Sequence, residues 1–377
     1  MPSISPIYTL YGVPHSLYTA KVRCYLRNQG IAYRERPTAD PNFVGRIVPL
    51  IGRAIIPVLE TPDGQVIQDT VDIIDYFERQ GVPYPAYPST PLQRVLAVIL
   101  EYYGGQGLLR HAMHYRWSYL EQQREFLEHA FASGSGAVLA QQVMARMQSY
   151  LPRLGVTEAS IPLIEASYLR LLDILEAHFE CMPYLLGGRP SLADYGMIGS
   201  LFAHLGRDPI PAQLMKLRSP RVFRWVERMT APDLDVVEYL DGPEGLWPDD
   251  QIPPTLEPLL QHVAAELFPE LGDKLAFLDA WTVREQPADG APVTDKPHRR
   301  QIASVQTEFR GVPIETGVEP YLRYVLQRAS DTVQALPELE QVRVMAELER
   351  VGLAGALPAN TGVRVARRHH IEVWSRV

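Results

Sequence analysis

The stretch AIIPVLETPDGQVIQDTVDIIDYFE, residues 54–78, combines the pattern of a buried strand with a residue that central strands normally exclude. Apolar residues flank Pro57 on both sides, yet proline supplies no N–H to a sheet ladder. A cis bond between Ile56 and Pro57 resolves this conflict, because the strand then enters through a tight bend. The bend turns the backbone N–H and C=O of Ile56 out of the sheet. We therefore predict a cis bond and, at Ile56, a backbone edge on which an extended peptide can dock.

The rest of this stretch predicts a hairpin followed by a helix. Residues 61–64, Thr-Pro-Asp-Gly, form a turn signal between two short strands, which indicates an antiparallel pair. Asp69 or Thr70 then begins a helix that ends at Gly81. The unpaired N–H groups and the positive dipole end of this helix make its start suitable for a carboxylate. The simpler alternative is that Asp69 and Thr70 only cap the helix.

The residues before this stretch alternate between strand and helix patterns. Residues 7–12 predict a strand, 17–30 a helix ending at a glycine, and 31–37 a second strand. Residues 38–53 show no regular pattern and are expected to be irregular. The predicted order is β-α-β, then β-β-α.

A proline-rich linker at 82–91 separates this part from a helical one. The chain thus predicts three parts, at 1–81, 92–230 and 231–377, the last being a mostly helical extension packed on the second. Within it, 284–300 is a polar loop and the end of the chain alternates like a strand. The helix patterns of the second part cover 92–130, 137–150, 158–181, 191–206 and 219–230.

Composition and charge exclude several classes of protein. The 377 residues carry a net charge of −8, which argues against a nucleic-acid partner. The two cysteines, Cys24 and Cys181, exclude a disulfide framework or a cysteine-rich zinc site and fit a reducing compartment. The first residues lack a signal-peptide pattern, and no apolar run reaches the ~18 residues of a membrane span. We expect a soluble, cytoplasmic protein.

A PVL strand, a turn, and an acid-plus-hydroxyl pair opening a helix resemble the thioredoxin-like N-terminal domain of the cytosolic glutathione transferases. The resemblance implies an α/β thioredoxin-like domain followed by an all-α domain, with glutathione as co-substrate. In that family the residue before the cis-proline pairs with the cysteinyl part of glutathione, and the pair before the third helix holds the γ-glutamyl end. The matching positions are Ile56, Pro57, Asp69 and Thr70, with Asp-Thr in place of the usual Glu-Ser or Gln-Ser.

A second part of the resemblance lies in LLGGRPSLADYGMIGSLFAHL, residues 185–205. Ser191 and Asp194 have the spacing of a capping box, with Asp in place of Glu. This pattern is similar to the central helix start of the transferase C-terminal domain, so we interpret both residues as structural. The resemblance covers residues 1–230 and is most specific in the first half.

The transferase reaction requires glutathione as a thiolate, which one hydroxyl near a helix N-terminus can stabilise. Counting back from Val22-Arg23, as in the serine and cysteine classes of the family, identifies Ser16 as the catalytic residue. Tyr11, at the end of the first strand, is the runner-up by the spacing of the tyrosine classes, and Tyr18 is a third choice. Cys24 lies on an apolar helix face and is expected in the core.

Residues around the site complete the expectation. Arg53 either pairs with the glycyl carboxylate of glutathione or is a solvated loop charge. The second substrate is expected between the domains, against the helix at 92–130. His111 and His114 are spaced i,i+3, but without supporting ligands we expect no metal. The predicted cleft residues, which could equally belong to the core, are Tyr103, His111, His114 and Tyr115.

We therefore expect a glutathione-dependent transferase acting on a small electrophile, with a homodimer implied by the resemblance. Two alternatives remain open. One is a glutathione-dependent disulfide reductase, peroxidase or dehalogenase on the same scaffold. The other is a non-catalytic interaction module whose C-terminal extension meets a partner.

Overall fold

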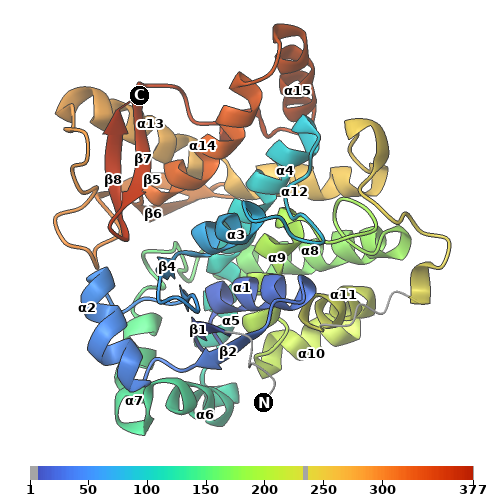
Figure 1. The fold of residues 1–377 in the computed structure, drawn as a ribbon. Helices are drawn as coiled ribbons and strands as arrows, with labels where there is room; N and C mark the ends of the chain where they lie inside the picture. Colours follow the sequence, from blue (N-terminus) through green and yellow to red (C-terminus); the bar gives the residue numbers. More distant parts are fainter. Residues whose placement is uncertain (1–6, 232–236, 377) are drawn as a thin grey trace, which may run out of the picture.

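The computed structural model describes residues 7–231 and 237–376 and begins with a small mixed sheet (Figure 1). The strand order is β2-β1-β3-β4, with β1 parallel to β2 and antiparallel to β3, and β3 antiparallel to β4. Helices α1 (Leu17–Asn28) and α3 (Thr70–Glu78) share one apolar cluster with the sheet. The strands are β1 (Tyr8–Tyr11), β2 (Tyr33–Arg36), β3 (Val58–Glu60) and β4 (Val66–Gln68).

The predicted thioredoxin-like fold is confirmed, as are the cis Ile56–Pro57 bond and the β3–β4 hairpin. The expectation that 38–53 is irregular was wrong. A π-helical turn, Phe43–Ile47, runs into the short helix α2 (Val48–Ile51), which ends at Gly52 with a φ of 73°. Phe43, Ile47 and Ile51 point into a second apolar cluster on the sheet, so tertiary packing stabilises helical segments too short to be recognised by periodicity.

The second part is all-helical, as expected, although the helical stretch at 92–130 is broken. A π-helical turn at Tyr103–Gly107 separates α4 from α5, and α10 was not predicted. Among the described residues, no helix is long and apolar enough to cross a membrane. The helices are α4 (Pro91–Tyr102), α5 (Leu109–Trp117), α6 (Arg124–Ser135), α7 (Ala137–Gln148), α8 (Ile161–Cys181), α9 (Leu192–Ala203), α10 (Pro209–Arg218) and α11 (Pro220–Thr230).

Helix α9 is almost completely buried at the centre of this part, and α4 crosses it at close range. A Cβ atom at Gly104 would lie 2.3 Å from the backbone of Gly196, and one at Gly196 would lie 2.3 Å from Cα of Glu101. Any larger side chain at either glycine would force the two backbones apart. This contact sets the position of the α4–α5 turn.

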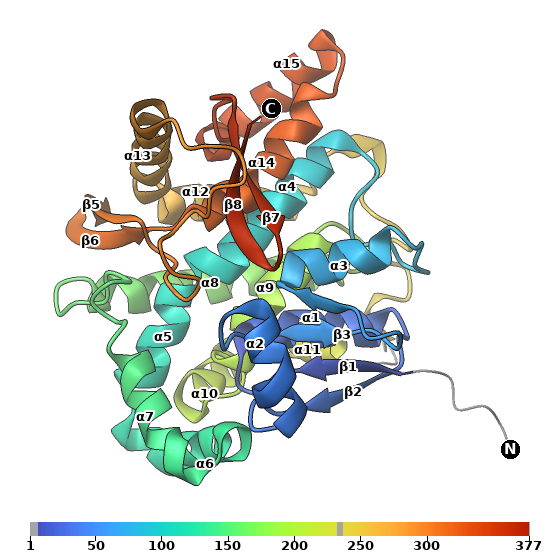
Figure 2. The same cartoon turned by 60° about the vertical axis from the view of Figure 1, so that its left-hand side comes forward.

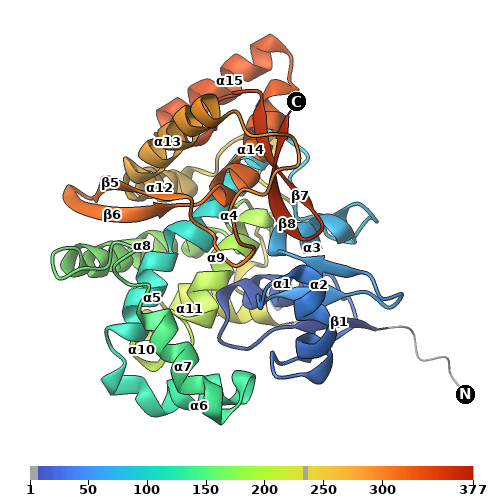
Figure 3. The same ribbon diagram turned by 90° about the vertical axis from the view of Figure 1, so that its left-hand side faces the viewer.

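The C-terminal extension is mostly helical, as expected, but it also contains two β-hairpins (Figures 2 and 3). Helix α14 packs along α4. The β7–β8 hairpin instead reaches α3 and the residues before Pro57. The elements are α12 (Glu257–Leu267), α13 (Glu270–Glu285), β5 (Ala303–Phe309), β6 (Val312–Val318), α14 (Tyr321–Gln334), α15 (Glu338–Arg350), β7 (Val363–Arg368) and β8 (Ile371–Arg376).

Asp194 is the buried acceptor that holds the start of α9. Its carboxylate accepts from the N–H and the hydroxyl of Ser191, at 2.9 and 3.0 Å, which confirms the capping box. It also accepts from the N–H of Leu185 at 3.0 Å and from Nε1 of Trp225 at 3.2 Å. One side chain therefore joins a loop, a helix start and α11.

We expect Asp194→Ala to lower the free energy of unfolding by about 3 kcal/mol, because it leaves buried donors without an acceptor. Thermal unfolding checks this. Asp194→Asn, which keeps one carbonyl oxygen as an acceptor, should lower the free energy of unfolding clearly less. Equal losses in the two variants would contradict the role assigned to the lost acceptors.

Candidate functional site

A large cavity of about 1850 Å³ opens between the sheet, helices α5 to α7 and the extension. The start of α1 and the residues before Pro57 form one wall, and apolar side chains of α5, α6 and α7 form the opposite one. Residues 298–304 and β6, from the extension, close a third side. Three segments far apart in the sequence thus build one space.

Ile56 lies on the cavity wall directly before the cis bond to Pro57. In the described part of the chain its backbone N–H and C=O have no hydrogen-bond partner. The ladder to β1 begins only at Val58, opposite Tyr11. An extended peptide can therefore pair with the backbone of Ile56.

Ser16 lies on the same wall as the N-cap of α1. Its Oγ accepts a hydrogen bond from the N–H of Thr19 at 3.3 Å. Among the described residues, no acceptor takes the hydroxyl proton of Ser16. The hydroxyl can therefore donate this proton to an anion in the cavity.

The two tyrosine alternatives are placed differently. Tyr11 packs against Phe43, away from the cavity, and its hydroxyl donates to Glu60 at 2.9 Å. Tyr18 lines the cavity, but its hydroxyl donates to the carbonyl of Gly105 at 3.3 Å and accepts from Gln106 at 3.1 Å. Burial raises the pKa of Tyr18 to about 12. Both tyrosine hydroxyls already donate to an acceptor, so neither is free to stabilise a thiolate, whereas the hydroxyl of Ser16 is.

Asp69, the predicted γ-glutamyl anchor, is buried and already paired. It caps α3 by accepting from the N–H of Val71 at 3.0 Å. Its other partners come from the extension: Nη2 of Arg367 at 3.1 Å and the hydroxyl of Tyr321 at 3.0 Å. Burial raises the pKa of Asp69, but Arg367 and the Val71 N–H outweigh this effect and hold it below its ordinary value. Thr70, beside it, is also buried.

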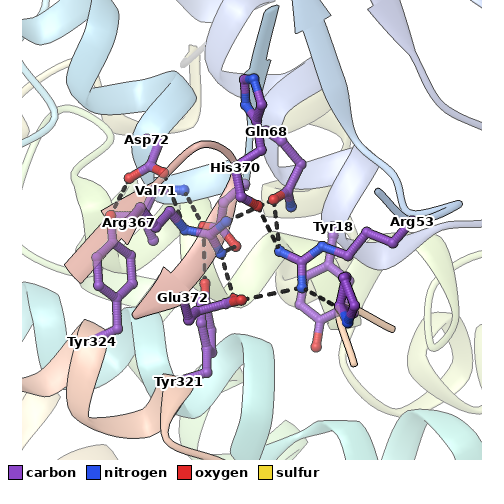
Figure 4. Close-up of polar contacts among 12 residues, drawn as sticks. Tyr18, Arg53, Gln68, Val71, Asp72, Tyr321, Tyr324, Arg367, His370 and Glu372 are labelled. Carbon is purple, nitrogen blue, oxygen red and sulfur yellow. Dashed lines mark hydrogen bonds and ion pairs between the residues drawn. The ribbon is translucent and has the colours of Figure 1, made fainter. Parts of the chain in front are cut away.

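Arg53 is neither a solvated loop charge nor open to a ligand. Its guanidinium contacts Glu372 Oε2 at 3.1 Å and Gln68 Oε1 at 2.9 Å, and donates to the carbonyl of His370 at 3.2 Å. Arg367 contacts the same two partners, Gln68 at 2.6 Å and Glu372 at 2.7 Å (Figure 4). The β7–β8 hairpin therefore covers the part of the site at the start of α3 and leaves Ile56 and Ser16 open.

The predicted cleft residues do not line this cavity. All four are buried in the helical core: Tyr103, His111, His114 and Tyr115. His114 contacts Glu165 at 3.1 Å, and burial lowers the pKa of His111 to about 3. Within the described residues, no group of three His, Cys, Asp or Glu side chains could hold a metal ion. The cavity wall is formed instead by other side chains of α5, such as Met113 and Trp117.

The cysteines take no part in the site. Cys24 is buried, as expected, and burial raises the pKa of its thiol to about 12. Cys181 is exposed at the end of α8 and does not line the cavity.

The contacts of Arg53 and Asp69 with the hairpin were not predicted from the sequence. The sequence RVARRHHIEV, residues 364–373, carries a signal only in hindsight, as a strand pair rich in arginine. Nothing local shows that one of these arginines, Arg367, is buried against Asp69 while its neighbour Arg368 is half exposed and pairs with Asp289.

Two family models match the chain. The glutathione S-transferase N-terminal domain matches residues 10–83, which include the sheet and α3, and the glutathione S-transferase C-terminal domain matches residues 157–228, from α8 into α11. No curated protein matches the chain.

Solved structures of glutathione transferases are similar to part of the chain. That of Xanthobacter autotrophicus Py2 is 20% identical, with a TM-score of 0.36, over 62% of this chain and 98% of its own. That of Methylobacterium radiotolerans JCM 2831, in complex with glutathione sulfonate, is 20% identical, with a TM-score of 0.38, over 65% and 99%. One from Phanerochaete chrysosporium is 16% identical, with a TM-score of 0.43, over 61% and 99%.

Arg367 and Arg368 offer a matched test of the covered part of the site. Arg367→Ala leaves the carboxylates of Asp69 and Glu372 buried without this partner. We therefore expect the free energy of opening the β7–β8 hairpin to fall by about 3 kcal/mol or more. Native-state hydrogen exchange at the strand amides measures this free energy. Arg368→Ala removes an exposed pair and should change it by less than about 1 kcal/mol. Equal effects of the two substitutions would show that the buried Arg367 stabilises the hairpin no more than the exposed Arg368 does.

Proposed function

Because the chain belongs to the glutathione S-transferase superfamily, we propose that it binds glutathione against Ser16 and Ile56 and joins the glutathione sulfur to an electrophile in the cavity, so that the whole glutathionyl group is transferred. The thiolate forms a bond to an electrophilic carbon, and the leaving group departs with its electron pair. The observation that carries this proposal is a pair of unused groups on one wall: the hydroxyl proton of Ser16 and the backbone of Ile56.

The energy required of Ser16 is modest. A thiol with a pKa of about 8.5 is only a few per cent ionised at pH 7. A hydrogen bond to the anion worth about 1.5–3 kcal/mol lowers this pKa by roughly one to two units. The N-terminus of α1, which Ser16 caps, adds positive potential at the same place. No metal or general base is needed for this step.

The cavity supports a second substrate that is largely apolar. Its volume of about 1850 Å³ exceeds the roughly 300–1,000 Å³ of ordinary small-molecule sites, so both reactants fit at once. The same thiolate would also attack a disulfide, a hydroperoxide or a carbon–halogen bond. A panel of these substrates separates the transferase from the reductase, peroxidase and dehalogenase alternatives.

One observation favours the non-catalytic alternative. Arg367 and Tyr321 occupy the carboxylate of Asp69, which the family resemblance assigns to the γ-glutamyl end of glutathione. If this pairing is permanent, glutathione has no γ-glutamyl anchor and the chain is an interaction module. Retention on immobilised glutathione separates the two functions, because the module should pass through.

We expect Ser16→Ala to lower activity at pH 7 about tenfold, because the pKa of bound glutathione rises by one to two units. Glutathione binding, measured by calorimetry, should persist because the contacts at Ile56 are unchanged. The loss should shrink as the pH rises toward 9, where free thiolate becomes plentiful. Loss of the N-cap should also cost about 1 kcal/mol of stability.

Tyr11→Phe is the matched control, since it also removes one hydroxyl from the first domain. It should leave the ultraviolet absorbance of bound thiolate nearly unchanged. If that absorbance disappears in Tyr11→Phe and survives in Ser16→Ala, the assignment of Ser16 is wrong.

A further inference from the structure

Arg300 is a cation that the proposed reaction does not use. It belongs to the extension, in the loop between α13 and β5, and it lines the cavity together with Ser16 and Ile56. Its guanidinium stacks on the ring of Tyr321, with its central carbon 5.0 Å from the ring centroid. Across residues 7–231 and 237–376, its side chain makes no hydrogen bond and no ion pair within 4.0 Å. Its donors are therefore available to a ligand.

Four arginines near Arg300 are occupied, and the two others that line the cavity, Arg146 and Arg153, are exposed. Arg299 pairs with Asp295 at 2.8 Å, and Arg116 pairs with Asp208 at 2.7 Å. Arg53 and Arg367 are held by carboxylates under the hairpin. Arg300 differs from these four because its guanidinium is half-buried yet has no carboxylate in contact.

The charge balance of the cavity also favours an anion. Five arginines line it, Arg116, Arg146, Arg153, Arg299 and Arg300, against two glutamates, Glu315 and Glu319. Glu315 already accepts from Ser304 at 2.5 Å. Burial lowers the pKa of Arg300, but Glu319 and Glu372 outweigh it and keep the guanidinium charged.

The opposite wall is mostly apolar and is built from three helices. Side chains of α5, α6 and α7 form it, among them Met113, Trp117, Phe131, Val143 and Met147. Leu139 and Tyr150, which also line the cavity, are exposed. An apolar body lying along this wall would be stabilised because its surface and that of the wall leave water. The apolar wall and Arg300 therefore suit a single ligand that has an apolar body and an anionic end.

We propose that Arg300 binds the carboxylate of a ligand whose long apolar body lies against α5 and α7. A guanidinium offers a planar fork of donors that matches a carboxylate, and its stacking on Tyr321 holds the fork in place. The C-terminal extension thus supplies the group that selects the ligand. This binding needs neither Ser16 nor glutathione, so it stands independently of the proposed reaction.

Calorimetry on the full chain tests the proposal with two probes, dodecanoate and dodecan-1-ol. They share an apolar chain, and only dodecanoate carries the carboxylate. We expect Arg300→Gln to weaken dodecanoate binding about ten- to a hundredfold and to leave dodecan-1-ol binding unchanged. Unchanged alcohol binding also shows that the cavity of the variant is intact. Arg299→Gln, the adjacent and already paired arginine, should leave both affinities unchanged.

A third probe, glutathione, separates the two sources of a carboxylate. Glutathione binding should be the same in Arg300→Gln and in the unsubstituted protein. If Arg300→Gln weakens glutathione and spares dodecanoate, Arg300 serves the co-substrate and the proposal is overturned. It is also overturned if the unsubstituted protein binds both dodecyl probes equally, or binds neither.

Discussion

The buried pairing of Arg367 with Asp69 and Glu372 is the contact on which the arrangement of the whole site depends. It joins the last hairpin of the chain to the start of α3 in the first domain. Taking these charges out of water is expensive, and their mutual attraction offsets that cost only when the geometry is good. Gln68 and Arg53 complete the hydrogen bonding, so nearly every donor and acceptor in the cluster has a partner. Such a cluster fixes the position of the hairpin, because a shifted hairpin would leave several charges buried and unpaired.

The position of the hairpin decides which part of the first domain stays open. The side of the site near Asp69 is covered, whereas Ser16 and Ile56 still face the cavity. The chain that leads from α13 to β5 lines the same cavity, and Arg300 lies in this segment. The extension therefore closes one half of a site and adds a charged group to the other half.

The remaining wall depends on how the helices cross. Gly104 and Gly196 let α4 approach α9, and Ser191 and Asp194 hold the start of α9 in place. The turn after α4 then directs α5 past the first domain. As a result, Met113 faces the cavity, while His111 and His114 on the same helix turn into the core.

The sequence by itself determined the features that arise from neighbouring residues. The cis bond at Pro57, the β3–β4 hairpin, the cap at Asp69 and the Ser191–Asp194 box all follow from short-range geometry, and all were predicted. Short-range signals failed at α2 (Val48–Ile51), where four residues are too few for a period and packing on the sheet decides. They also missed α10 and the π-helical turn that separates α4 from α5.

Only the tertiary structure decided which groups meet across the chain. Asp69 and Arg367 are separated by 298 positions, and no local pattern carries information about such a pair. The same limit applies to the aromatic-rich segment at 92–130, where α5 carries aromatic side chains both in the core, as at Tyr115, and on the cavity wall, as at Trp117. Which of two adjacent arginines, Arg299 or Arg300, is paired depends on what lies opposite each one. That is a property of packed surfaces and not of the sequence around them.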